Sequence, residues 1–159
     1  MRKAASARND ADIKATRDRL AAIIRAKSFR NDREFTLASG RRSTVYFNMK
    51  PTMFDPEGAA LIARLVLDAL GDADYVAGLE MGAVPIVAQV AMMSHLTSRP
   101  STGAEGRPVA GFFVRKRPKD HGTQNLIDGL GEGVTLAGAR VAVLEDVTTS
   151  GGSALQAAQ

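Results

Sequence analysis

The chain has 159 residues, 45% of them hydrophobic and 24% charged, which is typical of a single globular domain with one core. It has no cysteine and only two histidines, which excludes disulfides, a thiolate nucleophile and a Cys-based metal site and argues against a His-rich one. The net charge of +4 with an aromatic content of 5% argues against stacking platforms for single-stranded nucleic acid and favours a compact polyanion as ligand.

A disordered tail and a helix are predicted at the N-terminus. Residues 1–9 are basic and polar, and no apolar segment of a secretory signal follows them, so a cytoplasmic location is expected. Asp10 and Asp12 are candidate N-caps of a helix. Its apolar residues recur at helical spacing: Ile13, Leu20, Ile23 and Ile24.

A β-hairpin is predicted over residues 35–47, because apolar residues flank a Ser39-Gly40 turn and residues 45–47 favour strand. The clearest helix begins at Asp55-Pro56, with Asp as N-cap and Pro in the first turn, and ends at Gly71. The apolar face of that helix consists of Leu61, Ile62, Leu65, Val66 and Leu70.

From residue 75 onward the sequence alternates between strand, turn and helix. Residues 75–79, 109–114 and 140–144 are short apolar runs, and residues 84–93 are a helical segment after a turn at 80–83. Such alternation is typical of a parallel sheet covered by helices. Residues 98–107 are predicted to form a loop, and residues 115–133 a longer one. Loops as long as the second are usually functional or mobile.

The segment 141–153, Val-Ala-Val-Leu-Glu-Asp-Val-Thr-Thr-Ser-Gly-Gly-Ser, is the most informative part of the chain. Its apolar start predicts a buried parallel strand, so Glu145 and Asp146 stand at the carboxyl end of that strand, where open α/β sheets bind ligands. Hydroxyls and glycines then precede a helix, where backbone N–H groups bind phosphate. Carboxylates next to a phosphate-binding turn suggest a phosphorylated sugar.

This segment resembles the phosphoribosyl-pyrophosphate (PRPP) motif of the type I phosphoribosyltransferases. It differs from a P-loop, because no Gly-Lys-Ser/Thr follows. The resemblance implies that Glu145 and Asp146 bind the ribose hydroxyls. It also implies that the following turn binds the PRPP phosphate through Val147, Thr148, Thr149, Ser150, Gly151, Gly152 and Ser153.

A basic run, Arg115-Lys-Arg-Pro-Lys-Asp-His-Gly122, follows the strand at 109–114. On its own it fits a solvated loop, a nucleic-acid contact or a lid over a polyanion. A lid would place Lys and Arg at the negative charge of departing pyrophosphate and exclude water.

The same run resembles the catalytic loop of orotate phosphoribosyltransferases. That resemblance implies a mobile loop that reaches the neighbouring subunit's site in a homodimer. It implies catalytic roles for Lys119, Asp120 and His121, and PRPP binding by Arg115, Lys116, Lys119 and His121.

Two further segments carry the same resemblance. Residues 35–50 resemble the N-terminal hairpin that covers orotate, which implies orotate contacts from Tyr46, Phe47, Lys50 and Thr149, although many members have Lys where Ala38 stands. Residues 78–85 match the strand-to-helix turn that binds pyrophosphate. Some relatives carry Lys in this turn, whereas residues 80–83 contain none, so backbone N–H groups are expected to serve instead.

The resemblance implies a type I phosphoribosyltransferase fold: an α/β core with a central parallel sheet flanked by helices, and a small N-terminal hood that contains the hairpin. The expected divisions are a disordered tail at 1–9, the hood at 10–54 and the core at 55–159. The family continues beyond the helix after the PRPP motif, with an Asp-Arg-Glu-type segment whose Arg contacts substrate. A C-terminal truncation at Gln159 and an incomplete core are therefore expected.

The implied function is transfer of phosphoribose from PRPP to orotate, giving orotidine 5′-monophosphate and pyrophosphate in pyrimidine biosynthesis. Mg²⁺ is expected mainly on PRPP oxygens, near Glu145 and Asp146, with no dedicated metal site. Alternatives are a phosphoribosyltransferase for a purine base and a non-catalytic PRPP-sensing regulator. A DNA-binding module is a weaker alternative, since no helix-turn-helix pattern precedes the core.

Overall fold

The computed structural model describes residues 2–36, 40, 42–97, 108–117, 126–148 and 150–159, with the backbone only for residues 2–9. The chain forms two compact units, Met1–Leu65 and Val66–Gln159. The boundary between them falls inside the helix that begins at residue 56, rather than before Asp55 as the predicted hood and core would place it.

The first unit begins with helix α1 (Arg2–Lys27). The predicted disordered tail is therefore helical from residue 2 onward, and Asp10 and Asp12 lie inside the helix rather than at its N-cap. The physical reason is local: residues 3–8 are rich in alanine and long basic side chains, and no Gly or Pro interrupts the chain before Lys27. Inside the helix, Asp12 pairs with Arg64.

Two short antiparallel ribbons follow. Strand β2 (Phe35–Thr36) pairs with β3 (Arg42–Ser43), which confirms the predicted hairpin. Strand β4 (Tyr46–Phe47) does not extend that hairpin. It pairs with β1 (Phe29–Arg30), with Phe29 opposite Phe47.

Helices α2 (Lys50–Met53) and α3 (Pro56–Ala69) complete the first unit and lead into the second. Asp55 caps α3 as predicted: its Oδ1 accepts a hydrogen bond of 2.9 Å from the Gly58 N–H. The buried apolar residues of this unit come from α1, α2 and α3 and the turn before α2. They are Ile23, Met49, Met53, Ile62 and Ala63.

The second unit is built on a four-stranded sheet in the order β7-β6-β5-β8. Strands β5 (Tyr75–Leu79), β6 (Ala110–Val114) and β8 (Val141–Leu144) are parallel, as predicted. Strand β7 (Ile127–Asp128) is antiparallel to β6 and lies within the segment predicted as a loop.

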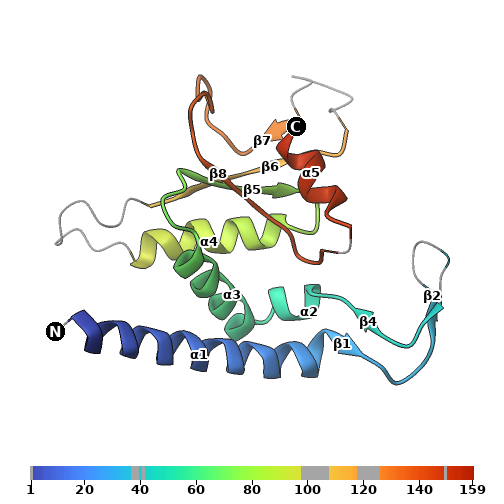
Figure 1. Ribbon diagram of the computed structural model, residues 1–159. Coiled ribbons are helices and arrows are strands. Elements are labelled where there is room, and N and C mark those ends of the chain that lie inside the picture. Colours follow the sequence, from blue (N-terminus) through green and yellow to red (C-terminus); the bar gives the residue numbers. More distant parts are fainter. Residues whose placement is uncertain (1, 37–39, 41, 98–107, 118–125, 149) are drawn as a thin grey trace. The chain divides into compact units, whose positions relative to one another are not determined.

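Helices cover both faces of this sheet (Figure 1). Helix α4 (Val84–Thr97) packs on β5 and β6, with Val87 directly over Gly111. Helix α5 (Gly152–Ala158) packs on β5 and β8. On that opposite face, Ala157 joins a core formed by Ala77, Leu79, Phe112 and Val114. Because side chains alternate along β5 and β6, successive residues of these strands pack against α4 on one face and α5 on the other.

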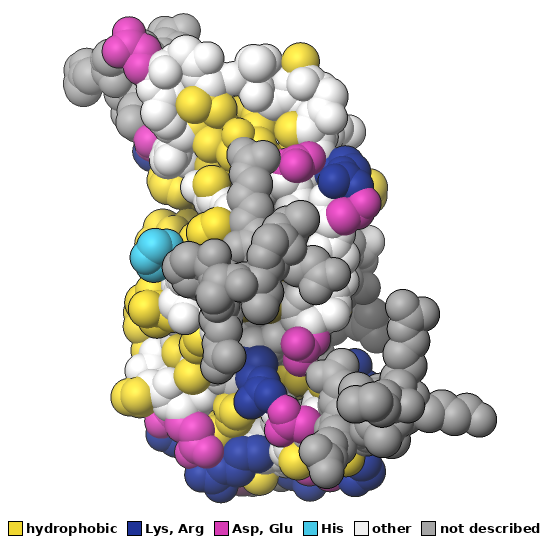
Figure 2. All heavy atoms as spheres, turned by 90° about the vertical axis from the view of Figure 1, so that its left-hand side faces the viewer, with side chains coloured by type: hydrophobic (Ala, Val, Ile, Leu, Met, Phe, Trp, Pro, Cys, Tyr) yellow, Lys and Arg dark blue, Asp and Glu magenta, His cyan; other side chains and the backbone are white. Residues whose placement is uncertain are grey.

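Charged side chains of both signs and hydrophobic ones share the surface shown in Figure 2. Helix α4 contributes exposed Met92 and Leu96. None of the helices in the described part of the chain combines the length and the apolar character needed to cross a bilayer.

Candidate functional site

A cavity of about 470 Å³ lies at the carboxyl ends of the parallel strands. Because β5, β6 and β8 run in the same direction, the segments that leave them meet at one edge of the sheet. The residues that line the cavity come from these segments and from α5. They are Leu79, Lys116, Glu145, Val147, Thr148, Ser150, Gly151, Gly152, Ser153 and Gln156.

Two adjacent carboxylates mark the end of β8. Glu145 is half-buried at the cavity, and burial raises the pKa of its carboxyl group above the ordinary value. The charge of Asp146 and a hydrogen bond to it raise this pKa further, whereas the charge of Lys116 lowers it. The negative charge of the two carboxylates is poorly compensated by protein groups. The pair can therefore accept hydrogen bonds from a diol or bind a cation.

Asp146 lies directly against the turn that follows β5. A Cβ atom on Gly82 would stand 2.4 Å from Asp146 Oδ1, so only glycine fits there without a shift. A Cβ atom on Gly78 would likewise stand 2.3 Å from the Cβ of Ala83 and 2.9 Å from the Leu144 oxygen. The turn at 80–83 and the acidic end of β8 therefore form one contiguous wall, although they are far apart in the sequence.

The start of the basic run is fixed from the side of β5. The Glu80 N–H donates to the Val114 oxygen and the Lys116 N–H donates to Glu80 Oε1, both at 2.8 Å. Glu80 thus holds the chain on both sides of Arg115.

On the other side, the Arg115 N–H donates to the Leu126 oxygen at 2.7 Å, and Arg115 Nη1 lies 3.3 Å from Asp128 Oδ2. The Nε atom of Arg115 is buried and has no hydrogen-bond partner among the described residues. Arg115 therefore pairs with β7 and does not line the cavity, whereas Lys116 does.

The glycine- and hydroxyl-rich turn leads from β8 into α5. Gly151 has a φ of 76°, in the left-handed region that glycine adopts readily, and its oxygen accepts a 3.0 Å hydrogen bond from the Leu155 N–H. The Gly152 N–H donates to Ser150 Oγ at 3.4 Å. Residues of this turn line the same cavity as Lys116, and backbone amides, hydroxyls and an ammonium group together suit an anion.

The remaining predicted site residues either are outside the described part of the chain or belong to the first unit. Lys119, Asp120, His121, Thr149 and also Ala38 are outside the described residues. Tyr46, Phe47 and Lys50 belong to the first unit. There Tyr46 stacks on Phe35 at 5.1 Å between ring centroids, Phe47 meets Phe29 edge-on at 6.4 Å, and Lys50 is the exposed first residue of α2.

Three residues with a place at this edge were not predicted. Gln156 lines the cavity one turn into α5, Leu79 forms part of its floor, and Glu80 binds the start of the basic run. Leu79 and Glu80 fall within residues 78–85, the strand-to-helix turn that the sequence already singled out. The signal for Gln156 is its position one turn after the glycines at 151–152.

Comparisons with known proteins agree on one relationship. No family model matches the chain. An orotate phosphoribosyltransferase of Rhodopseudomonas palustris (strain BisB18) is 54% identical over 147 residues, which cover 91% of this chain and 74% of the relative.

Solved structures give the same relationship. The orotate phosphoribosyltransferase of Mycobacterium tuberculosis H37Rv in complex with Fe(III) dicitrate is 36% identical, with a TM-score of 0.68 over 90% of this chain and 74% of that one. The same enzyme in complex with PRPP is 33% identical, with a TM-score of 0.64 over 90% and 72%. These likenesses confirm the predicted α/β fold with a central parallel sheet flanked by helices.

Proposed function

Because this chain belongs to the orotate phosphoribosyltransferase family, we propose that it transfers the phosphoribosyl group of PRPP to orotate. The products are orotidine 5′-monophosphate and pyrophosphate, in pyrimidine biosynthesis. The observation that carries the proposal is the cavity at the sheet edge, whose lining brings together Glu145, a glycine- and hydroxyl-rich turn and Lys116. Asp146 directly follows Glu145 and interacts with it.

The cavity suits the ribose 5-phosphate part of PRPP. The carboxylate oxygens of Glu145 and Asp146 accept hydrogen bonds from the two ribose hydroxyls. The turn from Val147 to Ser153 binds the 5-phosphate through backbone N–H groups and hydroxyls. Gly82 allows the 80–83 turn to approach Asp146, so backbone N–H groups of that turn can serve the pyrophosphate without a lysine.

The transfer needs no covalent enzyme intermediate. A ring nitrogen of orotate, whose proton passes to the Asp120 carboxylate or to water, forms a bond to the anomeric carbon. The bond from that carbon to the pyrophosphate oxygen breaks at the same time, and its electron pair leaves with pyrophosphate. We assign Lys119, Asp120 and His121 to this step, with Lys116, Lys119 and His121 binding PRPP. Arg115, which pairs with Asp128 and does not line the cavity of its own subunit, is assigned to PRPP in the neighbouring subunit's site. Cationic groups at the departing oxygens stabilise the charge that develops there.

Orotate itself is assigned to Tyr46, Phe47, Lys50 and Thr149. The exposed rings of Tyr46 and Phe47 offer apolar faces to a planar base, and the exposed ammonium of Lys50 offers a partner for a carboxylate. This assignment depends on the family resemblance of residues 35–50.

Mg²⁺ fits the same cavity. No three His, Cys, Asp or Glu side chains of the described residues gather to hold a metal, whereas Mg²⁺ commonly binds one or two carboxylates together with substrate phosphates. Glu145, whose pKa is raised by burial and then by the charge of Asp146, and Asp146 itself are the residues that would face it. When bound, the ion would neutralise pyrophosphate charge.

A homodimer is part of the proposal, with the loop after β6 contributing to the neighbouring subunit's site. Since the proposed lid residues follow the fixed stem at Lys116, the loop has an anchored base from which to reach outward. The proposed location is the cytoplasm.

The test is PRPP-dependent consumption of orotate by the full-length gene product, with adenine, hypoxanthine and uracil as competing bases. Orotate turnover is expected, and turnover of a purine base alone would contradict the proposal. In the Glu145→Gln, Asp146→Asn double variant, calorimetry should show weaker PRPP binding with the fold retained. PRPP binding without turnover of any base would instead favour a regulator.

A further inference from the structure

We propose that Ser28 and Thr52 are positioning residues: they fix the position of Lys50 and of the neighbouring segment that is proposed to contact orotate. The inference rests on the proposed role of Lys50 toward orotate. The observation that carries it is a buried hydroxyl pair in the first unit: Ser28 Oγ and Thr52 Oγ1 lie 2.6 Å apart, with Ser28 2% and Thr52 0% exposed.

Ser28 holds the segment around Lys50 at two points. Its hydroxyl bonds to Thr52, and its backbone oxygen accepts a 2.9 Å hydrogen bond from the Asn48 N–H. These two partners stand two residues after and two residues before Lys50. Ser28 also directly follows α1 and precedes β1, whose Phe29 is opposite Phe47. One residue therefore fixes the segment that contains all three proposed orotate contacts of this unit.

The backbone of Lys50 is bonded on both sides. Its N–H donates to Asn48 Oδ1 at 3.2 Å, and its oxygen accepts a 3.0 Å hydrogen bond from the Phe54 N–H. The side chain of Lys50 is exposed. Its backbone is thus positioned while its ammonium group is left available for a ligand.

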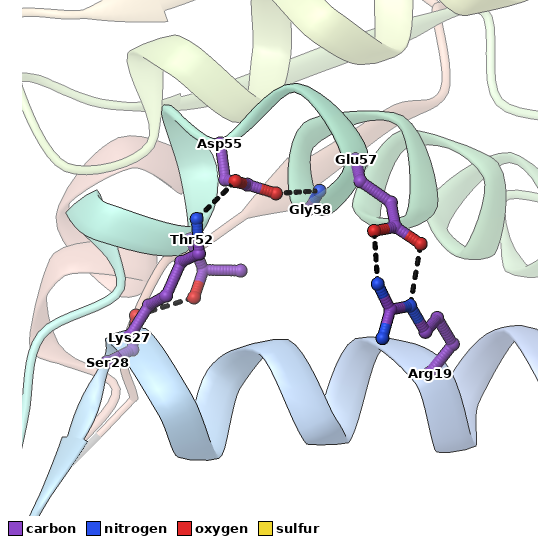
Figure 3. Close-up of polar contacts among 7 residues, drawn as sticks. All are labelled: Arg19, Lys27, Ser28, Thr52, Asp55, Glu57 and Gly58. Carbon is purple, nitrogen blue, oxygen red and sulfur yellow. Dashed lines mark hydrogen bonds and ion pairs between the residues drawn. The ribbon is translucent and has the colours of Figure 1, made fainter.

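Thr52 cannot move independently, because its backbone is also packed closely against Gly58 at the start of α3. A Cβ atom on Gly58 would stand 2.4 Å from the Thr52 oxygen, so α3 begins in direct contact with α2. Lys27 pairs with Asp55, and Asp55 caps α3 through Gly58 (Figure 3). The end of α1 therefore binds both α2 and the start of α3, with the hydroxyl pair at the buried centre.

A hydroxyl pair suits positioning better than stabilisation. Two apolar side chains would fill the same buried space, and replacing both partners of a hydrogen bond costs little stability. What an apolar pair lacks is direction, since a hydrogen bond fixes distance and angle whereas apolar contacts allow sliding. We therefore expect removal of the pair to affect orotate more than it affects folding.

The experiment compares variants of the full-length gene product by steady-state kinetics for orotate and PRPP and by melting temperature. Ser28→Ala with Thr52→Val should raise the KM for orotate by about three- to tenfold, leaving the KM for PRPP unchanged. Thr52→Ser, which keeps the hydroxyl, should behave like the parent. Should the double variant be insoluble, Thr52→Val alone is expected to give the same selective change.

The matched control is Glu57→Gln. Glu57 accepts hydrogen bonds from Arg19 at 2.7 and 2.5 Å, so this pair also joins α1 to α3 (Figure 3), but it does not touch residues 48–52. It should lower the melting temperature slightly and leave the KM for orotate unchanged. If the double variant behaves in the same way as Glu57→Gln, the pair is merely structural and the inference is wrong.

Lys50→Ala separates the two possible failures. It should raise the KM for orotate at least tenfold. If Lys50→Ala raises that KM and the hydroxyl variants do not, only the positioning role is wrong. If Lys50→Ala itself leaves the KM unchanged while the enzyme turns over orotate, the assignment of Lys50 under the proposed function is wrong, and the inference is overturned with it.

Discussion

At Gly82 the absence of a side chain determines how closely two separate segments can approach. The turn after β5 reaches Asp146 only because no Cβ atom stands between them. The half-buried Glu145 next to it has a raised pKa. Burial therefore disfavours the charged form of Glu145, which is common where a ligand completes the site.

We expect Gly82→Ala to weaken PRPP binding by about tenfold or more, because the new methyl group must displace either the turn or the Asp146 carboxylate. Isothermal calorimetry with PRPP measures this. Gly131→Ala is the matched control, since a Cβ atom there meets only a Val134 methyl at 3.8 Å. Equal affinities for the two variants would show that the close approach does not matter for the ligand.

We expect Glu145→Gln to stabilise the protein in the absence of PRPP and Mg²⁺ at about pH 7. A raised carboxyl pKa means that the folded state favours the protonated form. The corresponding stability is present below the ordinary pKa of 4.5 and is lost as pH rises through the folded value. Because glutamine keeps the neutral form at every pH, its advantage should shrink on acidification.

Melting temperatures of parent and variant at neutral and acidic pH measure this difference. Glu132→Gln, which removes an exposed carboxylate from the same unit, is the control for net charge. An advantage for Glu145→Gln that grows as pH falls would contradict the sign of the shift.

At the scale of elements, α3 depends on the residue just before it. Asp55 caps the helix through Gly58 and pairs with Lys27. The charge of Lys27 and the Gly58 N–H lower the pKa of the Asp55 carboxyl group. A lowered pKa adds stability above the ordinary aspartate value of 3.8, and that stability is lost as pH falls through the folded value.

Asp55→Ala should therefore lower the melting temperature by a few degrees at neutral pH, and Asp55→Asn by less, because asparagine still accepts the capping hydrogen bond. Both differences should shrink as pH falls through the folded-state pKa of Asp55, which lies below the ordinary value of 3.8. Thermal melts followed by circular dichroism give these values. An asparagine variant as unstable as the alanine variant would assign the whole effect to the Lys27 ion pair.

The elements that the sequence predicted well are those with strong local signals. Asp55-Pro56 marked the start of α3, and the apolar runs at 75–79 and 141–144 marked parallel strands. Strands β1 and β4 were missed as partners because two residues carry no periodicity. The acidic pair was predicted from its place after a strand. The contact between Gly82 and Asp146 depends on tertiary packing and leaves no local trace.

At the scale of the whole molecule, the proposed ligand links several segments of the second unit. PRPP at a hundred times its dissociation constant should add about 2.7 kcal/mol to the free energy of unfolding, because it binds only the folded state. The melting temperature should rise by several degrees. Differential scanning fluorimetry measures the shift.

The Glu145→Gln, Asp146→Asn double variant should lose most of that shift. Orthophosphate at the same concentration is the control, since it can occupy the turn but offers no ribose hydroxyls. A shift of equal size with orthophosphate would mean that the acidic pair contributes nothing to ligand binding.

The strand order also bears on the step of folding at which the cavity forms. Gly78 pairs with Leu144, and Gly82 contacts Asp146, so the cavity wall joins segments from opposite ends of the second unit. Such non-local pairings carry a large loop-closure entropy and form slowly. If they close late on the folding pathway, the transition state contains no complete cavity. PRPP would then lower the rate of unfolding and leave the rate of folding unchanged. The ligand would thus increase the kinetic stability of a chain that has already folded.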